Sequence, residues 1–308
     1  MRLYFILFLT LLFYGCNQKD SKLKIKSSDK VLLSAEINLN NKVERIIDSS
    51  FKIKNNDTSL VKVANYLIQK NAIKSISIKS YLKDNVLASN TSSTYDNTGN
   101  ISESIFSSKN RKTIVKYDEY GNSTLTHSFN ENDKLQTELK YNNTYDNSNL
   151  IKIEKLDKDG LIFETVEFKY DSSDNLIKKT TKGSSNMMNK EVFSYNKNNQ
   201  KTKSIFFSSN SLQDSTLYYY DKDLLSKIET YSRNFKDEFD KNPSKIIYTY
   251  DEIDRLIEVK HIASFGSISR YYQYQYFDSM KNWYEKGNYD SAGNLIYLIK
   301  RKIILNKL

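Results

Sequence analysis

Apolar and polar side chains alternate along most of this chain in short stretches. Before Tyr170, for example, Val166 and Phe168 alternate with Glu167 and Lys169. A period of two places the apolar side chains on one face of an extended strand and the polar ones on the other. The pattern therefore predicts half-buried β-strands.

Many of these stretches end in the same short motif. It reads tyrosine, aspartate, two variable residues, Asp or Gly, Asn or Arg, and two aliphatic residues. Asp, Asn and Gly tolerate left-handed backbone, so the motif predicts a strand end, a tight turn and the start of the returning strand. Three copies are Tyr170-Asp171-Ser172-Ser173-Asp174-Asn175-Leu176-Ile177, Tyr250-Asp251-Glu252-Ile253-Asp254-Arg255-Leu256-Ile257 and Tyr289-Asp290-Ser291-Ala292-Gly293-Asn294-Leu295-Ile296.

The motif recurs at a nearly constant spacing. Four consecutive tyrosine anchors, Tyr145, Tyr170, Tyr195 and Tyr220, are 25 residues apart. A fixed period of this length is typical of repeat architectures. We therefore predict that residues 95–308 form an all-β array of antiparallel hairpins, arranged as an elongated, twisted or curled meander sheet or a β-solenoid-like strip.

Residues 30–94 lack a clean copy of the motif, and we predict that they form an N-terminal cap of strands and one short helix. The helix is expected over about 59–70, with Asp57 or Thr58 as its N-cap. A cap would cover the open end of a repeat array. Apolar residues at helical spacing support the helix: Leu60, Val63, Ala64, Leu67 and Ile68.

The N-terminus has the features of an export signal. Arg2 precedes an apolar run that is too short to span a bilayer, and Gly15 and Cys16 follow it. The box Phe13-Tyr14-Gly15-Cys16 resembles a bacterial lipoprotein signal. That resemblance implies that residues 1–15 are a signal peptide and that Cys16 is lipidated, which would anchor the chain in a membrane.

The residues after Cys16 extend this expectation. Residues 16–29 are rich in Lys, Ser, Asp and Gln and are predicted to form a flexible tether. Asn17 follows the cysteine, and resemblance to envelope sorting signals then favours the outer membrane, on its periplasmic face or at the cell surface. Cys16 is the single cysteine, so no intramolecular disulfide is expected.

From Tyr95 to about Ile304 the motifs resemble the tyrosine-aspartate repeats of the RHS/YD-repeat superfamily. The segment from Tyr274 to Asn294 is similar to the ending of small Bacteroidetes lipoproteins with repeats of this type. In large RHS proteins the repeats spiral into a hollow shell around a cargo domain. This chain has far fewer repeats, no proline-rich self-cleavage segment and no toxin-like tail, so the expected form is an open or partly curled strip.

Composition and candidate chemistry narrow the function further. Although 47 basic residues outnumber 37 acidic ones, the two signs are interspersed, and no nucleic-acid-binding module is present. His127 and His261 lie far apart and are expected to be ordinary strand residues. Asp157-Lys158-Asp159-Gly160 lacks the further ligands of a calcium loop and is predicted to be a turn. We predict no catalytic residues, metal or cofactor.

Aromatic clusters are the best binding signal in the sequence. The runs Tyr218-Tyr219-Tyr220 and Tyr271-Tyr272-Gln273-Tyr274-Gln275-Tyr276 are expected to place tyrosines on both faces of a strand. Such side chains are suited to contacts with sugars or protein partners, although cross-strand aromatic pairing also explains them. Trp283 is predicted to be a packing residue.

The leading hypothesis is a non-enzymatic envelope lipoprotein that binds a protein or a glycan. The alternatives are an envelope polysaccharide hydrolase and an immunity or chaperone-like partner of a repeat toxin.

Overall fold

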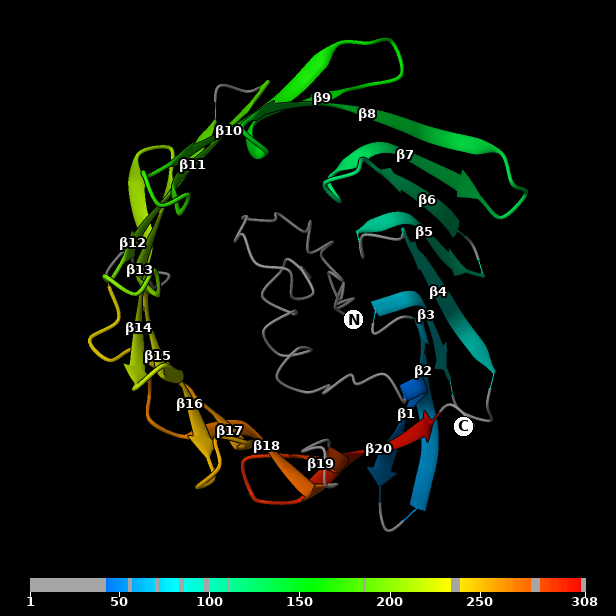
Figure 1. Cartoon of the computed structure of the whole chain (residues 1–308), viewed down its shortest axis with the longest axis vertical. Helices are drawn as coiled ribbons and strands as arrows, with labels where there is room; N and C mark the ends of the chain where they lie inside the picture. The colour runs from blue at the N-terminus through cyan, green and yellow to red at the C-terminus, as the bar shows by residue number, and fades with distance from the viewer. Residues whose placement is uncertain are drawn as a thin grey trace, which may run out of the picture.

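The computed structural model describes residues 43–54, 57–69, 72–82, 86–96, 100–109, 111–184, 187–233, 239–277 and 283–305. The predicted signal peptide, Cys16 and the tether lie outside these residues. Strands make up almost all of the described chain, and they form a wide ring when viewed along one axis (Figure 1). No helix long and apolar enough to cross a membrane occurs among the described residues.

Within the described ranges, twenty strands form one antiparallel sheet in which each strand pairs with the next along the chain. The first ten are β1 (Val43–Lys54), β2 (Asp57–Gln69), β3 (Ala72–Tyr81), β4 (Leu87–Tyr95), β5 (Ile101–Ser108), β6 (Arg111–Tyr117), β7 (Ser123–Asn130), β8 (Leu135–Asp146), β9 (Asn149–Leu156) and β10 (Ile162–Tyr170). The last ten are β11 (Leu176–Gly183), β12 (Met188–Tyr195), β13 (Lys201–Ser208), β14 (Ser211–Asp221), β15 (Leu224–Ser232), β16 (Ser244–Tyr250), β17 (Leu256–Ile262), β18 (Ile268–Phe277), β19 (Trp283–Tyr289) and β20 (Leu295–Leu305).

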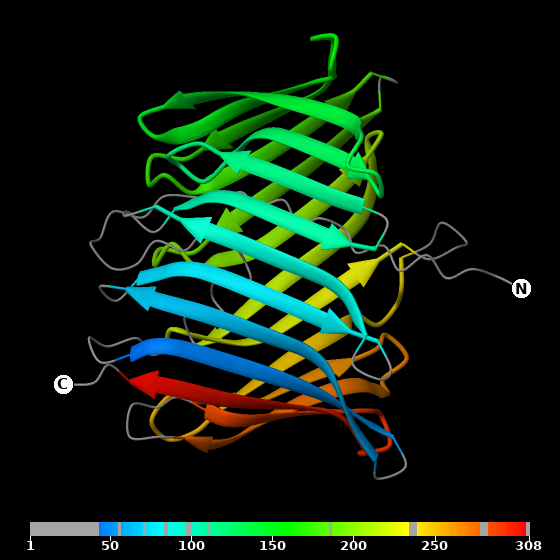
Figure 2. The same ribbon diagram turned by 90° about the vertical axis from the view of Figure 1, so that its right-hand side faces the viewer.

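The sheet closes into a barrel, and the predicted open strip or solenoid is therefore wrong. β1 pairs with β20 in antiparallel register, from Val43 opposite Leu305 to Lys52 opposite Tyr297. An open sheet of this size would leave two edges of unpaired main-chain groups, and closure pairs them. The closing strand comes from the region predicted to be a cap, which contributes β1 to β4 to the same sheet (Figure 2).

The predicted helix over 59–70 is also wrong, because these residues belong to β2. β2 pairs with β1 on one side and with β3 on the other, and a bulge at Val61 interrupts its alternation. Apolar residues occupy both faces of β2, and their spacing resembles a helical stripe. Two neighbouring strands and β-branched residues outweigh a weak local helical preference.

The tyrosine-aspartate motif forms the hairpins as predicted. Tyr170 is the last residue of β10, Asp171 to Asn175 make the turn, and Leu176 starts β11. The Asp171 carboxylate accepts hydrogen bonds from the main-chain N–H groups of Ser173 and Asn175, each at 2.9 Å. Burial raises the pKa of Asp171, but these hydrogen bonds outweigh it and leave the pKa below its usual value. The turn thus holds its aspartate as a carboxylate.

In several copies of the tyrosine-aspartate motif, a bulge follows the turn at the same place. Tyr170 pairs with Leu176 whereas Lys169 pairs with Lys178, so Ile177 is the extra residue. The same register shift occurs at the corresponding tyrosines of other copies, among them Tyr145, Tyr195, Tyr220 and Tyr250. A bulge increases the local twist of a strand, and repeated bulges help a sheet to curve and close.

The motif requires tyrosine because its hydroxyl group links consecutive hairpins. Tyr170 donates a hydrogen bond to the carbonyl oxygen of Leu150 at 2.9 Å, and Tyr195 donates to Leu176 at 2.9 Å. Tyr220 and Tyr250 donate to Lys201 and Leu225 in the same way, each at 3.0 Å. Each acceptor is the first or second residue of the return strand of the preceding hairpin. Tyrosine hydroxyls therefore form a ladder along one end of the barrel.

Removing one rung of this ladder is expected to have a modest cost. Tyr195→Phe should lower the free energy of unfolding by about 0.5–1.5 kcal/mol, because the Leu176 carbonyl loses a partner. Denaturant unfolding of the purified variant measures the effect. The matched control is Tyr284→Phe, since Tyr284 is exposed on β19 and should tolerate the change. Equal effects of the two variants would contradict the ladder.

The two faces of the closed sheet differ in character. Most buried strand side chains, including Ile46, Ser104, Val166 and Val259, share one face when the cross-strand pairs are followed around the ring. Side chains converge on the inside of a barrel and splay on its outside, so this is the concave face. Two core clusters of described residues lie there: Leu150, Ile153, Val166 and Phe168 form one, and Val259, Tyr274 and Trp283 form another.

Candidate functional site in the barrel lumen

The barrel is too wide for its own inward side chains to fill. Neighbouring strands lie about 4.8 Å apart, so twenty strands have a perimeter of about 100 Å even before tilt widens the ring. Eight strands suffice to make an interior that side chains fill, and much larger barrels hold a channel or a plug. The concave face is therefore a wall around a lumen that the side chains of the described strands do not fill.

The convex face carries rows of paired charges at mid-strand. Lys227 lies 3.0 Å from Glu229, and Lys260 lies 2.7 Å from Glu258. Further pairs on this face join Lys116 with Glu103, Lys140 with Glu138, Lys182 with Glu167 and Lys300 with Glu285. A lipid-facing lysine near the bilayer centre costs about 2–4 kcal/mol. This surface is suited to water and not to lipid tails.

The concave wall is aromatic and polar but carries fewer charges. Lys286 lies over the rings of Tyr272 and Tyr274, with its Nζ 5.2 Å and 4.6 Å from the two ring centroids. Lys201 similarly lies 4.6 Å from the ring centroid of Tyr218. Burial, together with the neighbouring Tyr117, raises the pKa of Tyr95 to about 12. The wall therefore presents rings and protonated hydroxyl groups to the lumen.

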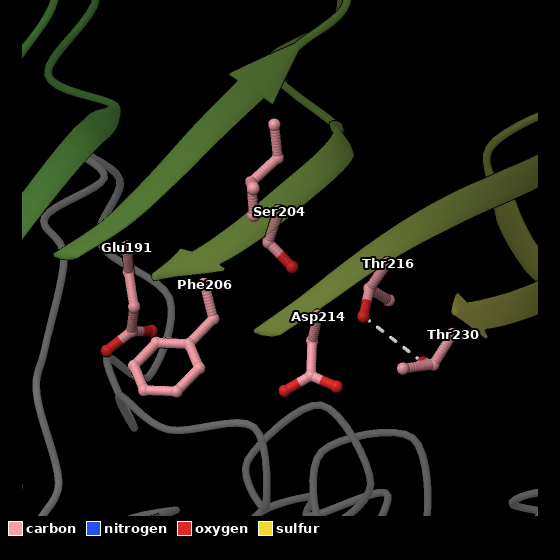
Figure 3. Close-up of a pocket in the computed structure, with 7 residues that line it drawn as sticks. Glu191, Ser204, Phe206, Asp214, Thr216 and Thr230 are labelled. Carbon is pink, nitrogen blue, oxygen red and sulfur yellow. Dashed lines mark hydrogen bonds between the residues drawn. The ribbon is translucent and has the colours of Figure 1, made fainter. Parts of the chain in front are cut away.

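A pocket of about 260 Å³ opens on this wall across β12, β13, β14 and β15. The Phe206 ring forms its centre, with Glu191 of β12 on one side and Asp214 of β14 on the other (Figure 3). The register brings them together, because Phe206 pairs directly with both residues. An aromatic platform between two carboxylates is suited to a polar ligand that has an apolar face.

The two carboxylates of the pocket are in different environments. Glu191 is paired with Lys179, whose Nζ lies 2.8 Å from its Oε1. No described side chain pairs with Asp214, which faces the pocket. Thr216 and Thr230 share a hydrogen bond of 3.1 Å beside it, and Ser204 completes the polar lining. Asp214 is thus the group in the pocket with most capacity to accept hydrogen bonds.

The structure separates the two histidines. His127 lies on the convex face of β7, where its Nε2 is 2.9 Å from Glu138. His261 lies on the concave face of β17 and packs edge-on against Tyr272. Burial lowers the pKa of His261, and nearby Arg270 lowers it further.

Asp157 accepts hydrogen bonds from the main chain of a hairpin turn, as predicted. Among the described residues, no three His, Cys, Asp or Glu side chains are grouped to bind a metal.

The tyrosine runs point to both faces, as their alternation predicts. Tyr218 lies on the concave face and Tyr219 on the convex face, where Tyr219 donates a hydrogen bond to Glu229 at 2.8 Å. Tyr271 stacks on Tyr289 with 4.8 Å between ring centroids, also on the convex face. Trp283 is buried among concave residues, as a packing residue should be.

The pocket was not predicted from the sequence. Its signal is present, because Glu191 has the same parity as Tyr195 at the end of β12, and Asp214 has the same parity as Tyr220 at the end of β14. The position of the motif tyrosine in each of these strands therefore shows which side chains of that strand point inward. Only the register between three strands, with its bulges, shows that Glu191, Phe206 and Asp214 meet.

No family model and no curated protein matches the chain. Among solved structures, a porin-like protein from Bacteroides uniformis ATCC 8492 is 8% identical, with a TM-score of 0.37, over 85% of this chain and 97% of that one. A porin-like protein from Bacteroides vulgatus ATCC 8482 is 10% identical, with a TM-score of 0.27, over 86% and 99%. A TcdB2-TccC3-Cdc42 structure is 11% identical, with a TM-score of 0.31, over 85% of this chain and 19% of that one. The chain thus spans about a fifth of that last protein, and these low similarities assign no function.

Proposed function

We propose that this protein is a non-enzymatic envelope lipoprotein whose barrel binds a glycan against the concave wall. The observation that carries the proposal is the way in which charged and aromatic side chains are divided between the two faces of the barrel. Paired charges cover the convex face, whereas aromatic and hydroxyl side chains cover the concave one. The barrel would stand in water at the membrane and would be held there by acyl chains on Cys16.

The pocket is where we place the glycan. A sugar ring offers C–H groups that pack on an aromatic face, and hydroxyl groups that donate to carboxylates and bond to threonine and serine. Phe206 would provide the face, and Asp214 would accept from sugar hydroxyls. The combination of one ring with carboxylate and hydroxyl groups in a small pocket favours a sugar over a polypeptide partner.

Truncating the platform is expected to weaken glycan binding. Phe206→Ala should lower affinity at least tenfold, while Phe207→Ala, its neighbour on the convex face, should leave binding unchanged. Full-length protein in detergent would be applied to an array of bacterial envelope polysaccharide fragments, and hits would be titrated by calorimetry. Absence of any bound glycan, or equal losses for both variants, would contradict the proposal.

The hydrolase alternative rests on the same two carboxylates. Glu191 and Asp214 lie two strands apart, so their backbones are separated by about 10 Å, and glycosidases place two carboxyl groups on either side of the bond they cleave. Under this alternative, incubation with a bound polysaccharide would release shorter fragments, and Asp214→Asn would abolish their release while binding persists. Recovery of the polysaccharide intact from the wild-type protein supports the binding function.

A further inference from the structure

The two ends of the barrel carry different side chains. In an antiparallel ring the turns after even-numbered strands lie at one end and those after odd-numbered strands at the other (Figure 2). We call the first end the acidic rim. Its described turn residues include nine acids and three bases, which are Asp96, Asp118, Glu119, Asp171, Asp174, Asp223, Asp251, Glu252, Asp254, Lys197, Lys222 and Arg255.

We call the opposite end the apolar rim. Its described turns hold acids and bases in nearly equal numbers: Glu131, Asp133, Asp157, Asp159, Asp240 and Asp290 against Lys109, Lys134, Lys158, Arg233 and Lys241. Most of the exposed large apolar residues described in the chain are at this end. They are Leu82, Val86, Leu87, Leu135, Leu161, Ile162, Met187 and Phe265.

The exposure of these side chains needs an explanation. Phe265 is 82% exposed and Leu161 is 66% exposed, at the tips of separate hairpins. A turn requires no apolar side chain at its tip, and exposed apolar residues that gather at one place mark an interaction surface. The acidic rim offers few such residues, with Ile253 and Tyr120 as its exposed apolar turn positions.

We propose that the apolar rim rests on the surface of the membrane that holds the Cys16 anchor, with its apolar hairpin tips inserted among the lipid headgroups. This inference rests on the anchoring part of the proposed function. An interface takes up isolated leucine, methionine and phenylalanine side chains together with flanking lysines. An anionic lipid surface repels the acidic rim, so charge and apolarity favour the same orientation.

The length of the tether permits this orientation. β1 begins at the acidic rim, so with the apolar rim on the membrane the 26 residues between Cys16 and Val43 would have to span at least the height of the barrel. Fully extended, they span about 90 Å. The barrel wall is at most about 43 Å tall, because its longest strand has 13 residues at about 3.3 Å each. The lipid anchor and the apolar rim can therefore reach the same membrane.

The test uses fluorophores on the lipidated full-length protein, in which acylation leaves no free thiol on Cys16. Leu161→Cys and Phe265→Cys at the apolar rim, and Ile253→Cys at the acidic rim as the matched control, would each be labelled with an environment-sensitive dye. In vesicles of phosphatidylethanolamine and phosphatidylglycerol, the first two should show blue-shifted emission that lipid-borne quenchers reduce. Ile253→Cys should show neither effect.

Equal emission at all three positions would overturn the inference, as would a shift that appears only when envelope proteins are added. The anchor is checked separately by comparing wild type with Cys16→Ser in detergent phase separation. If wild type stays in the aqueous phase, anchoring and this inference both fail. If wild type partitions with detergent but the rim dyes are unshifted, only the inference fails.

A second set of variants tests the same orientation without an attached dye. In the Cys16→Ser protein, the pair Leu161→Ser and Phe265→Ser should lower binding to the same vesicles at least tenfold, measured by cosedimentation. The pair Ile253→Ser and Tyr120→Ser should leave binding within twofold. Equal losses for the two pairs would overturn the orientation.

Discussion

Asp48→Ala is expected to lower the free energy of unfolding by about 3–5 kcal/mol. Asp48 of β1 and Arg301 of β20 form two hydrogen bonds of 2.7 Å on the concave side of the seam that closes the barrel. The Arg301 side chain is only 2% exposed, so the variant would leave its charge buried without its carboxylate partner. Denaturant unfolding measures the loss.

The location of this pair gives the variant a second, local readout. Asp48 and Arg301 are 253 residues apart in sequence and join the first strand to the last. Loss of the pair should therefore speed hydrogen exchange at the amides of β1 and β20 more than at those of β10 and β11. Uniform acceleration around the ring would contradict a specific role in closure.

Two controls distinguish the cost of leaving a buried charge unpaired from the cost of losing an exposed ion pair. Lys300→Ala removes a partner of Glu285 at 3.8 Å on the convex face, where the lysine side chain is 57% exposed, and should change stability by less than about 1 kcal/mol. The double variant Asp48→Leu with Arg301→Met removes both buried charges and should recover much of the stability lost in Asp48→Ala. Failure of the double variant to recover stability would point to the Arg301 contact with Trp283 as the larger contribution.

The hairpins could be predicted from the sequence because everything that specifies them is local. Alternation before Tyr170, the turn residues after it and the aliphatic pair Leu176 and Ile177 all lie within one repeat. Closure could not be predicted in this way. It depends on pairing between β1 and β20, which are at opposite ends of the chain, and on small bulge-induced twists that add up over twenty strands.

The pocket could not be predicted from the sequence for a related reason. Inward direction is a property of one strand and follows from parity with the motif tyrosine. Which side chains lie next to each other on adjacent strands depends on the register, and a register shift of one residue would exchange the two faces of the strand. Because each motif contains a bulge, parity cannot be carried across a turn by counting residues. Glu191 and Asp214 could therefore be assigned to the inside but not to each other.

The closed architecture also changes how the tyrosines should be interpreted. In an open strip neither face of a strand encloses a lumen, so Tyr218 and Tyr219 could both contact a ligand from solution. In the barrel, Tyr218 faces the lumen beside Ser204, whereas Tyr219 lies among the charged pairs of the outer surface. Ligand contacts are therefore expected from Tyr218 and its concave neighbours, and solubility from the side that carries Tyr219.

Phe168→Ala is expected to lower the free energy of unfolding by about 3–5 kcal/mol, because it opens a cavity in the concave core cluster. Lys169→Ala, one residue further along β10, changes a convex side chain and should cost less than about 0.5 kcal/mol. Thermal or denaturant unfolding of both variants would show this difference. If the wall were a thin sheet stabilised equally from both sides, the two losses would be similar. A large difference would instead show that packing free energy is concentrated on the inner side of the wall, where the ring of strands brings the side chains together.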